Sequence, residues 1–141
     1  MEPTNKKVSL LRIVAATIYD SLLMLGVWFL VGSLALSIKF VFTGEVSSLN
    51  PIAGMSLVIL STWLYFALFW IYGGKTLGMS SWKLRIISQN GNQITIIQTI
   101  IRFLSNILTI SFAGIPLFLR QINKNNKSLS DLLSKTSIIS D

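Results

Sequence analysis

Two charged residues of opposite sign stand within apolar stretches of this 141-residue chain. Asp20 follows Leu11 by nine residues, and Arg102 follows Ile94 by eight. If each stretch enters a bilayer as a helix, a rise of about 1.5 Å per residue puts both charges roughly 12–13 Å deep. An unpaired charge at mid-bilayer costs on the order of 2.5–3.5 kcal/mol. The sequence therefore predicts an Asp20–Arg102 ion pair between two helices.

Two roles are open for such a pair. It could simply fix the packing and register of the helices, or its ionisable groups could belong to a proton or ion pathway, because charges inside a membrane are functional candidates. Gln98 and Asn106 each lie four residues from Arg102, on the same helix face, and we expect both to be polar partners of the pair.

A longer polar stripe contains Arg102. Its members recur every three or four residues along an otherwise Ile-, Leu- and Phe-rich segment: Thr95, Gln98, Arg102, Ser105, Asn106 and Thr109. Lipid cannot satisfy such groups, so the stripe must face protein, trapped water or the membrane surface.

A second candidate pair joins the first apolar segment to the C-terminal region. Arg12, Ala16 and Asp20 follow one another at four-residue intervals and share one helix face. We expect Arg12 to pair with Asp131 at the cytoplasmic interface. An exposed ion pair contributes only about 0–1 kcal/mol, so its predicted role is to dock the tail against the first helix.

Most enzyme chemistries have no candidate residues in this chain. It has no cysteine and no histidine, which excludes disulfides, thiolate nucleophiles and Ser-His-Asp or Cys-His catalysis. Its five acidic residues are too scattered to suggest a metal site. We therefore expect neither an enzyme active site nor a cofactor.

The composition indicates an all-α integral membrane protein. Of the residues, 52% are hydrophobic and 12% charged, and the mean hydropathy is +0.67. We expect a cytoplasmic N-terminus over 1–10 and one domain over 11–141, with apolar segments at 11–38, 52–72 and 94–119 and a basic tail at 120–141. The first two segments are full transmembrane helices. The third is either a full span or a partial-depth helical hairpin, since 26 residues cannot make two spans of roughly 20.

The basic residues predict the orientation. Lys6, Lys7 and Arg12 place the N-terminus in the cytoplasm by the positive-inside rule, and residues 75–93 return there with three positive charges. The net charge of +7 comes mostly from such flanking segments. We therefore expect the lipid bilayer, and not nucleic acid, to be the partner.

A short internal echo bears on the C-terminal tail. Residues 75–88 (KTLGMSSWKLRIIS) and 127–140 (KSLSDLLSKTSIIS) align without gaps and match at six of fourteen positions. Chance similarity is one explanation. The other is that both contain a short strand-like piece and that the two pieces pair on one face, which would place the tail in the cytoplasm and make the third apolar segment enter and return.

The chain resembles the RDD family of bacterial multi-pass membrane proteins. Arg12 and Asp20, in RIVAATIYDSLL, are similar to the arginine and first aspartate of that family, and Asp131, in KSLSDLLSKTSII, is similar to the second aspartate. The central GKTLGMSSWKLRII and the later Arg102 also match. The resemblance covers about residues 10–140 and implies a plasma-membrane location with three apolar segments.

The family has no settled activity, although cation/proton exchange has been suggested for it. Two positions depart from its pattern: Ser130 stands where many members have His, and Lys135 where Gly is usual. These departures put in doubt a proton relay or tight turn built on that His or Gly.

Two functions from different classes follow. The leading hypothesis is a transporter of a small ion or solute, in particular by cation/proton exchange, with Asp20 and Arg102 in the pathway. Two spans and a partial hairpin hardly enclose a path for an ion across the membrane. This hypothesis therefore requires a homo-oligomer. The alternative is a non-transporting subunit or scaffold that binds a membrane partner.

Overall fold

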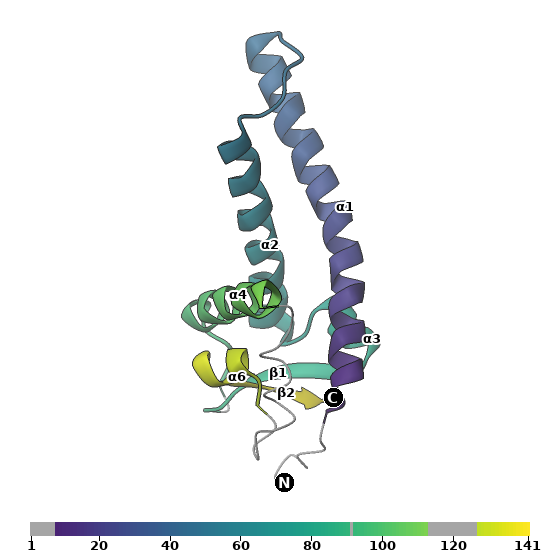
Figure 1. Ribbon diagram of the computed structural model, residues 1–141, viewed down its shortest axis with the longest axis vertical. Helices are drawn as coiled ribbons and strands as arrows, with labels where there is room; N and C mark the ends of the chain where they lie inside the picture. The colour runs from purple at the N-terminus through teal and green to yellow at the C-terminus, as the bar shows by residue number, and fades with distance from the viewer. Residues whose placement is uncertain (1–7, 91, 113–126) are drawn as a thin grey trace.

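Two long helices form an antiparallel hairpin in the computed structural model, which describes residues 8–90, 92–112 and 127–141 (Figure 1). Helix α1 spans Leu10–Thr43 and α2 spans Pro51–Gly73. At about 1.5 Å per residue they are roughly 50 Å and 35 Å long, so both exceed a hydrocarbon core of about 30 Å. The two predicted transmembrane helices are confirmed as elements, and α1 runs five residues past the predicted end at Ile38.

Local signals define the ends of these helices. The Asn50 side chain accepts a hydrogen bond from the Ile52 amide at 2.9 Å and so caps α2, with Pro51 as its first residue. Both helices end at a glycine in the left-handed conformation, Gly44 with φ 69° and Gly74 with φ 64°.

The side chains of the hairpin face outward. In the most apolar window of each helix only 6% of residues are buried, and large side chains such as Phe29 and Phe42 are 74% and 84% exposed. The core helix of a water-soluble protein would bury such residues. Helices of this length and exposure are therefore those of a membrane protein.

The third apolar segment contains helix α4, Ile96–Ser111, which lies across the hairpin near the end of α2 (Figure 1). Its 16 residues are about 24 Å long, too short to cross. This contradicts one continuous span over 94–119 and agrees with a segment of partial depth. The returning half of the expected hairpin lies outside the described residues.

Helix α4 turns its polar stripe inward. Thr99, Arg102 and Ser105 are at most 3% exposed, whereas Ile97 and Leu104 on the opposite face are 69% and 56% exposed. Of the predicted stripe, Arg102, Ser105 and Thr109 are buried against protein, Gln98 and Asn106 are half-buried, and Thr95 is exposed.

The internal echo is a structural repeat. Each copy is a short helix followed by a strand: α3 (Leu77–Ser81) with β1 (Leu84–Ser88), and α6 (Leu129–Leu133) with β2 (Thr136–Ser140). The strands pair antiparallel, so that Ile86 lies opposite its own counterpart Ile138. The two copies are therefore related by a local two-fold axis through this pair. The strand-like pieces and their pairing are confirmed, and β2 lies beside β1.

Equivalent bonds recur around the axis. Thr76 and Ser128 each cap the short helix of their copy. The Gln89 amide donates to the Lys135 carbonyl at 3.0 Å, and the Asp141 amide donates to the Lys83 carbonyl at 2.9 Å.

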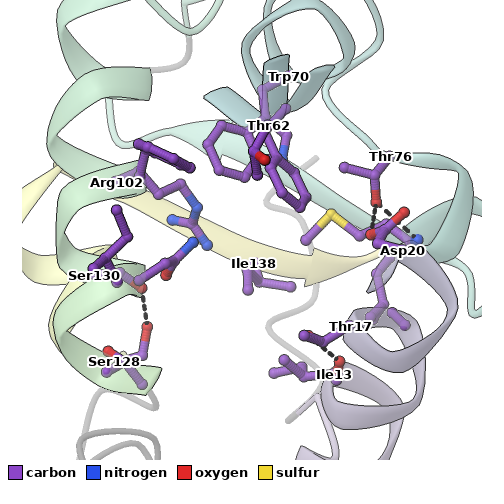
Figure 2. A pocket seen from close by; sticks show the side chains of 18 of the residues that line it. Ile13, Thr17, Asp20, Thr62, Trp70, Thr76, Arg102, Ser128, Ser130 and Ile138 are labelled. Carbon is purple, nitrogen blue, oxygen red and sulfur yellow. Dashed lines mark hydrogen bonds between the residues drawn. The ribbon is translucent and has the colours of Figure 1, made fainter. Parts of the chain in front are cut away.

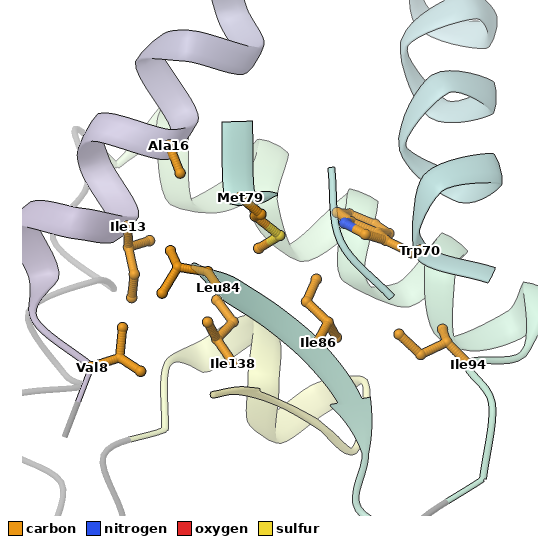
Figure 3. Packing of buried hydrophobic residues seen from close by; sticks show 9 residues of the cluster. All are labelled: Val8, Ile13, Ala16, Trp70, Met79, Leu84, Ile86, Ile94 and Ile138. Atoms are coloured by element: carbon orange, nitrogen blue, oxygen red, sulfur yellow. The ribbon is translucent and has the colours of Figure 1, made fainter. Parts of the chain in front are cut away.

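The hydrophobic core lies between the first turns of α1, the end of α2 and the strand pair (Figure 3). Leu84 and Ile86 of β1 are fully or almost fully buried, at 0% and 2% exposure. The complete cluster is Val8, Ile13, Ala16, Trp70, Met79, Leu84, Ile86, Ile94 and Ile138. This packing ties the strand pair to both long helices.

Asp141 forms ion pairs at this end of the molecule. The Asp141 carboxylate lies 2.5 Å from Lys75 Nζ and 3.5 Å from Arg85 Nε. The hydrogen bond from Lys75 holds the pKa of Asp141 below its ordinary value, and the charge of Arg85 acts in the same direction. The pair is about one-third exposed, so its stabilisation is small.

Lys135→Gly is expected to stabilise the protein by about 1 kcal/mol. Lys135 has φ 52°, as does its counterpart Lys83, and both therefore lie in the left-handed region of backbone conformation. A residue with a side chain is less stable there than glycine by about 1–2 kcal/mol. Glycine offsets part of this gain, because it loses more backbone entropy on folding. This strain explains why a turn at this position favours Gly. Thermal unfolding in detergent measures the change. Lys39→Gly, inside α1, is the control and should destabilise by about 1 kcal/mol; destabilisation by both would contradict the explanation.

Candidate functional site

Asp20 is buried where α1 meets α3, with only 4% of its surface exposed. Its Oδ2 accepts from the Thr76 hydroxyl at 2.5 Å, and its Oδ1 accepts from the Gly78 amide at 2.9 Å and the Tyr65 hydroxyl at 3.3 Å. Three donors from α2 and from the start of α3 thus hold this carboxylate. No basic side chain of the described residues lies within ion-pair distance of it.

Gly78 makes this approach sterically feasible. A Cβ at this position would lie 2.3 Å from the Ala16 carbonyl oxygen and 2.8 Å from Asp20 Cγ. The sequence analysis missed both Gly78 and Thr76 as site residues. The repeat offered a signal, because its second copy has Ser130 at the position of Gly78 and Ser128 at that of Thr76, each small or hydroxylated.

Arg12 binds the other end of α3. Its Nε donates to the Trp82 carbonyl at 3.1 Å, Nη2 donates to the Trp82 and Lys83 carbonyls, and Nη1 donates to Ser140 Oγ at 3.4 Å. The predicted pairing of Arg12 with Asp131 is therefore wrong. Arg12 does hold the C-terminal strand against α1, but by a hydroxyl bond. Arg12 and Asp20 thus form hydrogen bonds at opposite ends of α3.

Arg102 pairs with Asp131, and not with Asp20 as predicted. Its Nη1 lies 2.7 Å from Asp131 Oδ1 and 2.5 Å from the Thr136 hydroxyl, and both charged side chains are at most 3% exposed. The guanidinium also lies 5.6 Å from the centre of the Trp70 ring. The pairing differs because α4 crosses the hairpin and turns Arg102 toward α6. Asp131 Oδ2 accepts from the Ser128 amide at 3.1 Å and closes the cap of α6.

Gln98 and Asn106, which we expected to be partners of an Asp20–Arg102 pair, have other contacts. Gln98 donates to Ser88 Oγ at 3.2 Å and accepts from the Thr95 amide at 3.0 Å, so it joins the start of α4 to β1. Asn106 is half-buried and lines a cavity beside Arg102.

That cavity connects the sites of Asp20 and Arg102. It has a volume of about 470 Å³ and lies between α1, α2, α4 and the repeat. Figure 2 shows Asp20 with Thr76 on one side, Arg102 with Ser130 on the other, and Ile138 between them. Most of the wall is apolar: Ile13, Ala16, Val58, Ile59, Phe66, Trp70, Met79, Leu84, Phe103, Ile107 and Ile138.

The cavity is electrostatically asymmetric. Arg102 is neutralised by Asp131 at 2.7 Å, whereas Asp20 is hydrogen-bonded but faces no cation of the described chain. Two buried donors of the wall, Arg102 Nε and Trp70 Nε1, have no hydrogen-bond partner among the described residues. Among the described residues, the site can therefore offer a ligand the Asp20 carboxylate and two hydrogen-bond donors without partners.

Two membrane-length helices, a short amphipathic helix and a cavity flanked by buried charges define a helical membrane protein. The family model of the RDD family matches residues 9–135, and the chain belongs to this family. No curated protein and no solved structure matches the chain. The three residues that the resemblance singled out, Arg12, Asp20 and Asp131, each hold one end of a short repeat helix.

Proposed function

We propose that this RDD protein is a non-enzymatic, multi-pass transporter of the bacterial plasma membrane that exchanges a small cation for a proton. The observation that carries the proposal is the Asp20 carboxylate, which is 4% exposed, lines a cavity between membrane-length helices and has no basic partner in the described chain.

The chemistry of a buried carboxylate supports exchange. A charge removed from water must be paired or neutralised, and either a proton or a cation in the cavity can neutralise Asp20. One carboxylate accommodates only one of them at a time, which couples the two. The hydroxyls of Thr76 and Tyr65, which already contact Asp20, provide further oxygen atoms for a bound cation.

The distribution of charge supports a cytoplasmic N-terminus. The end of the molecule that holds the strand pair carries Lys75, Lys83, Arg85 and Lys135, whereas the turn between α1 and α2 has one basic and one acidic residue nearby. The positive-inside rule assigns the more basic end to the cytoplasm.

A homo-oligomer is part of the proposal. The two membrane-length helices of the described residues cannot by themselves surround a path across a bilayer, and α4 is too short to complete a wall. A second copy of the chain would supply the missing side.

Asp20→Asn is expected to abolish cation-driven proton flux in proteoliposomes. The amide oxygen can still accept from Gly78, and the amide nitrogen can donate to the Thr76 hydroxyl in place of the second carboxylate oxygen. The fold should therefore survive, but the group can no longer bind a proton or balance a cation. Proton flux is measured with a pH-sensitive dye while a voltage and gradients of sodium, potassium or a quaternary ammonium ion are imposed. Asp141→Asn removes an exposed carboxylate outside the cavity and should transport normally.

Undiminished flux in folded Asp20→Asn would refute the assigned role of Asp20. An absence of flux under every gradient, from folded wild-type protein, would refute transport altogether. A non-transporting subunit that binds a membrane partner would then be the better hypothesis.

A further inference from the structure

We propose that the cavity binds a monovalent organic cation with an apolar body, such as a lipophilic ammonium or phosphonium ion, with Asp20 as its counter-ion. This inference rests on the proposed function and names the class of substrate.

The size and the wall of the cavity fit a molecule larger than a metal ion. Pockets for small organic ligands usually measure about 300–1,000 Å³, and this one measures about 470 Å³. A metal ion needs a compact shell of oxygen, nitrogen or sulfur atoms. Here apolar side chains such as Ile13, Val58 and Ile107 form most of the wall, and they would contact an organic body but leave a bare ion unsolvated.

Aromatic rings lie where the body of such a cation would rest. Phe66, Trp70 and Phe103 all line the cavity, and the rings of Phe66 and Trp70 pack 5.2 Å apart. Ring faces attract cations with delocalised or shielded charge. Asp20 lies across the cavity from Arg102 (Figure 2), so a cation at Asp20 is separated from the basic side chain that lines the cavity among the described residues.

The opposite charge preference has its own physical basis, which the experiment must address. Arg102 Nε and Trp70 Nε1 are buried donors without a partner in the described chain, and an organic anion could use them. We favour the cation because Arg102 is already neutralised by Asp131 at 2.7 Å and Asp20 is not neutralised by any described residue.

The test uses two probes of the same shape and opposite charge, tetraphenylphosphonium and tetraphenylborate. Binding of each radiolabelled probe to the full chain in lipid nanodiscs is measured by equilibrium dialysis, with empty nanodiscs subtracted for partition into lipid. We expect saturable binding of the phosphonium and at least tenfold weaker binding of the borate. Saturable binding of the borate in preference, or of neither probe, would overturn the inference.

Two variants locate the site. Asp20→Asn should weaken phosphonium binding at least tenfold, while Asp141→Asn leaves it unchanged. Phe66→Leu retains every charge and should weaken binding by about 2- to 30-fold through the lost ring face. It provides an independent test if Asp20→Asn fails to fold. Unchanged binding in folded Asp20→Asn, or in Phe66→Leu, would place the probe elsewhere and overturn the inference.

Flux measurements on the same preparation separate this inference from the proposed function. Asp20-dependent sodium or potassium exchange without phosphonium binding would overturn the organic-cation site and leave transport standing. Saturable, Asp20-dependent phosphonium binding without flux of any cation would support the organic-cation site and overturn transport.

Discussion

Gly78→Ala is expected to separate α3 from α1 and to destabilise the protein by about 2.5–6 kcal/mol. The new Cβ would lie 2.3 Å from the Ala16 carbonyl oxygen, a backbone atom that cannot rotate away, and 2.8 Å from Asp20 Cγ. Relieving the clash means moving α3, which breaks the 2.9 Å bond from the Gly78 amide to Asp20. Overpacking costs about 1–3 kcal/mol and a lost bond to a charged acceptor about 1.5–3 kcal/mol. Thermal unfolding in detergent measures the sum.

Gly26→Ala is the matched control for this experiment. Gly26 lies inside α1, and a Cβ there meets nothing within 4 Å. Alanine in a helix interior is favoured over glycine by about 0.8–1 kcal/mol, so this variant should be equally or more stable. A Gly78→Ala protein with the same thermal unfolding temperature as the wild type would refute the close approach of α1 and α3.

Arg102→Met should destabilise the protein by about 3–5 kcal/mol. The side chain keeps much of its length, but Asp131, which has no exposed surface, loses the cation 2.7 Å away. Removing one partner of a buried ion pair is strongly destabilising, because the remaining charge loses the compensation that this partner provided. The free energy of unfolding in a denaturing detergent titration reports the effect.

A double variant separates the electrostatic effect of leaving Asp131 without Arg102 from the effect of lost packing. Arg102→Met with Asp131→Asn leaves no charge, and the amide can still accept from the Ser128 amide, so it should be more stable than Arg102→Met alone. Arg85→Met is the surface control. Arg85 is 45% exposed and only 3.5 Å from Asp141, so its loss should cost less than about 1 kcal/mol. A double variant as unstable as Arg102→Met would show that packing dominates.

Local pattern was sufficient to predict the elements. An uncharged run from Ile52 to Tyr72, capped by Asn50 and ended by glycine, specifies α2 without reference to the rest of the chain. The echo between residues 75–88 and 127–140 had two explanations, chance similarity or two strand-like pieces that pair, and the structure has the paired strands. The polar stripe indicated which face of α4 turns inward.

The partners of the charged groups could not be obtained in the same way. Asp20 and Arg102 were paired because both lie at similar depth, but depth is a single coordinate and gives neither the tilt of a helix nor its neighbours. Helix α4 crosses the hairpin, so Arg102 meets Asp131. The donors to Asp20 come from Thr76 and Gly78, residues without charge that carry no signal in a search for opposite charges.

The pairing of β1 with β2 has a consequence for the order in which the molecule is made. Ile86 and its partner Ile138 are 52 positions apart in the sequence. A ribosome adding about 5–20 residues per second takes roughly 3–10 seconds to cover that distance. During this interval the α1–α2 hairpin can already occupy the bilayer, while β1 exposes an unpaired edge and Arg102 has no Asp131 to contact. The cavity is therefore completed only after the second copy of the repeat has left the ribosome.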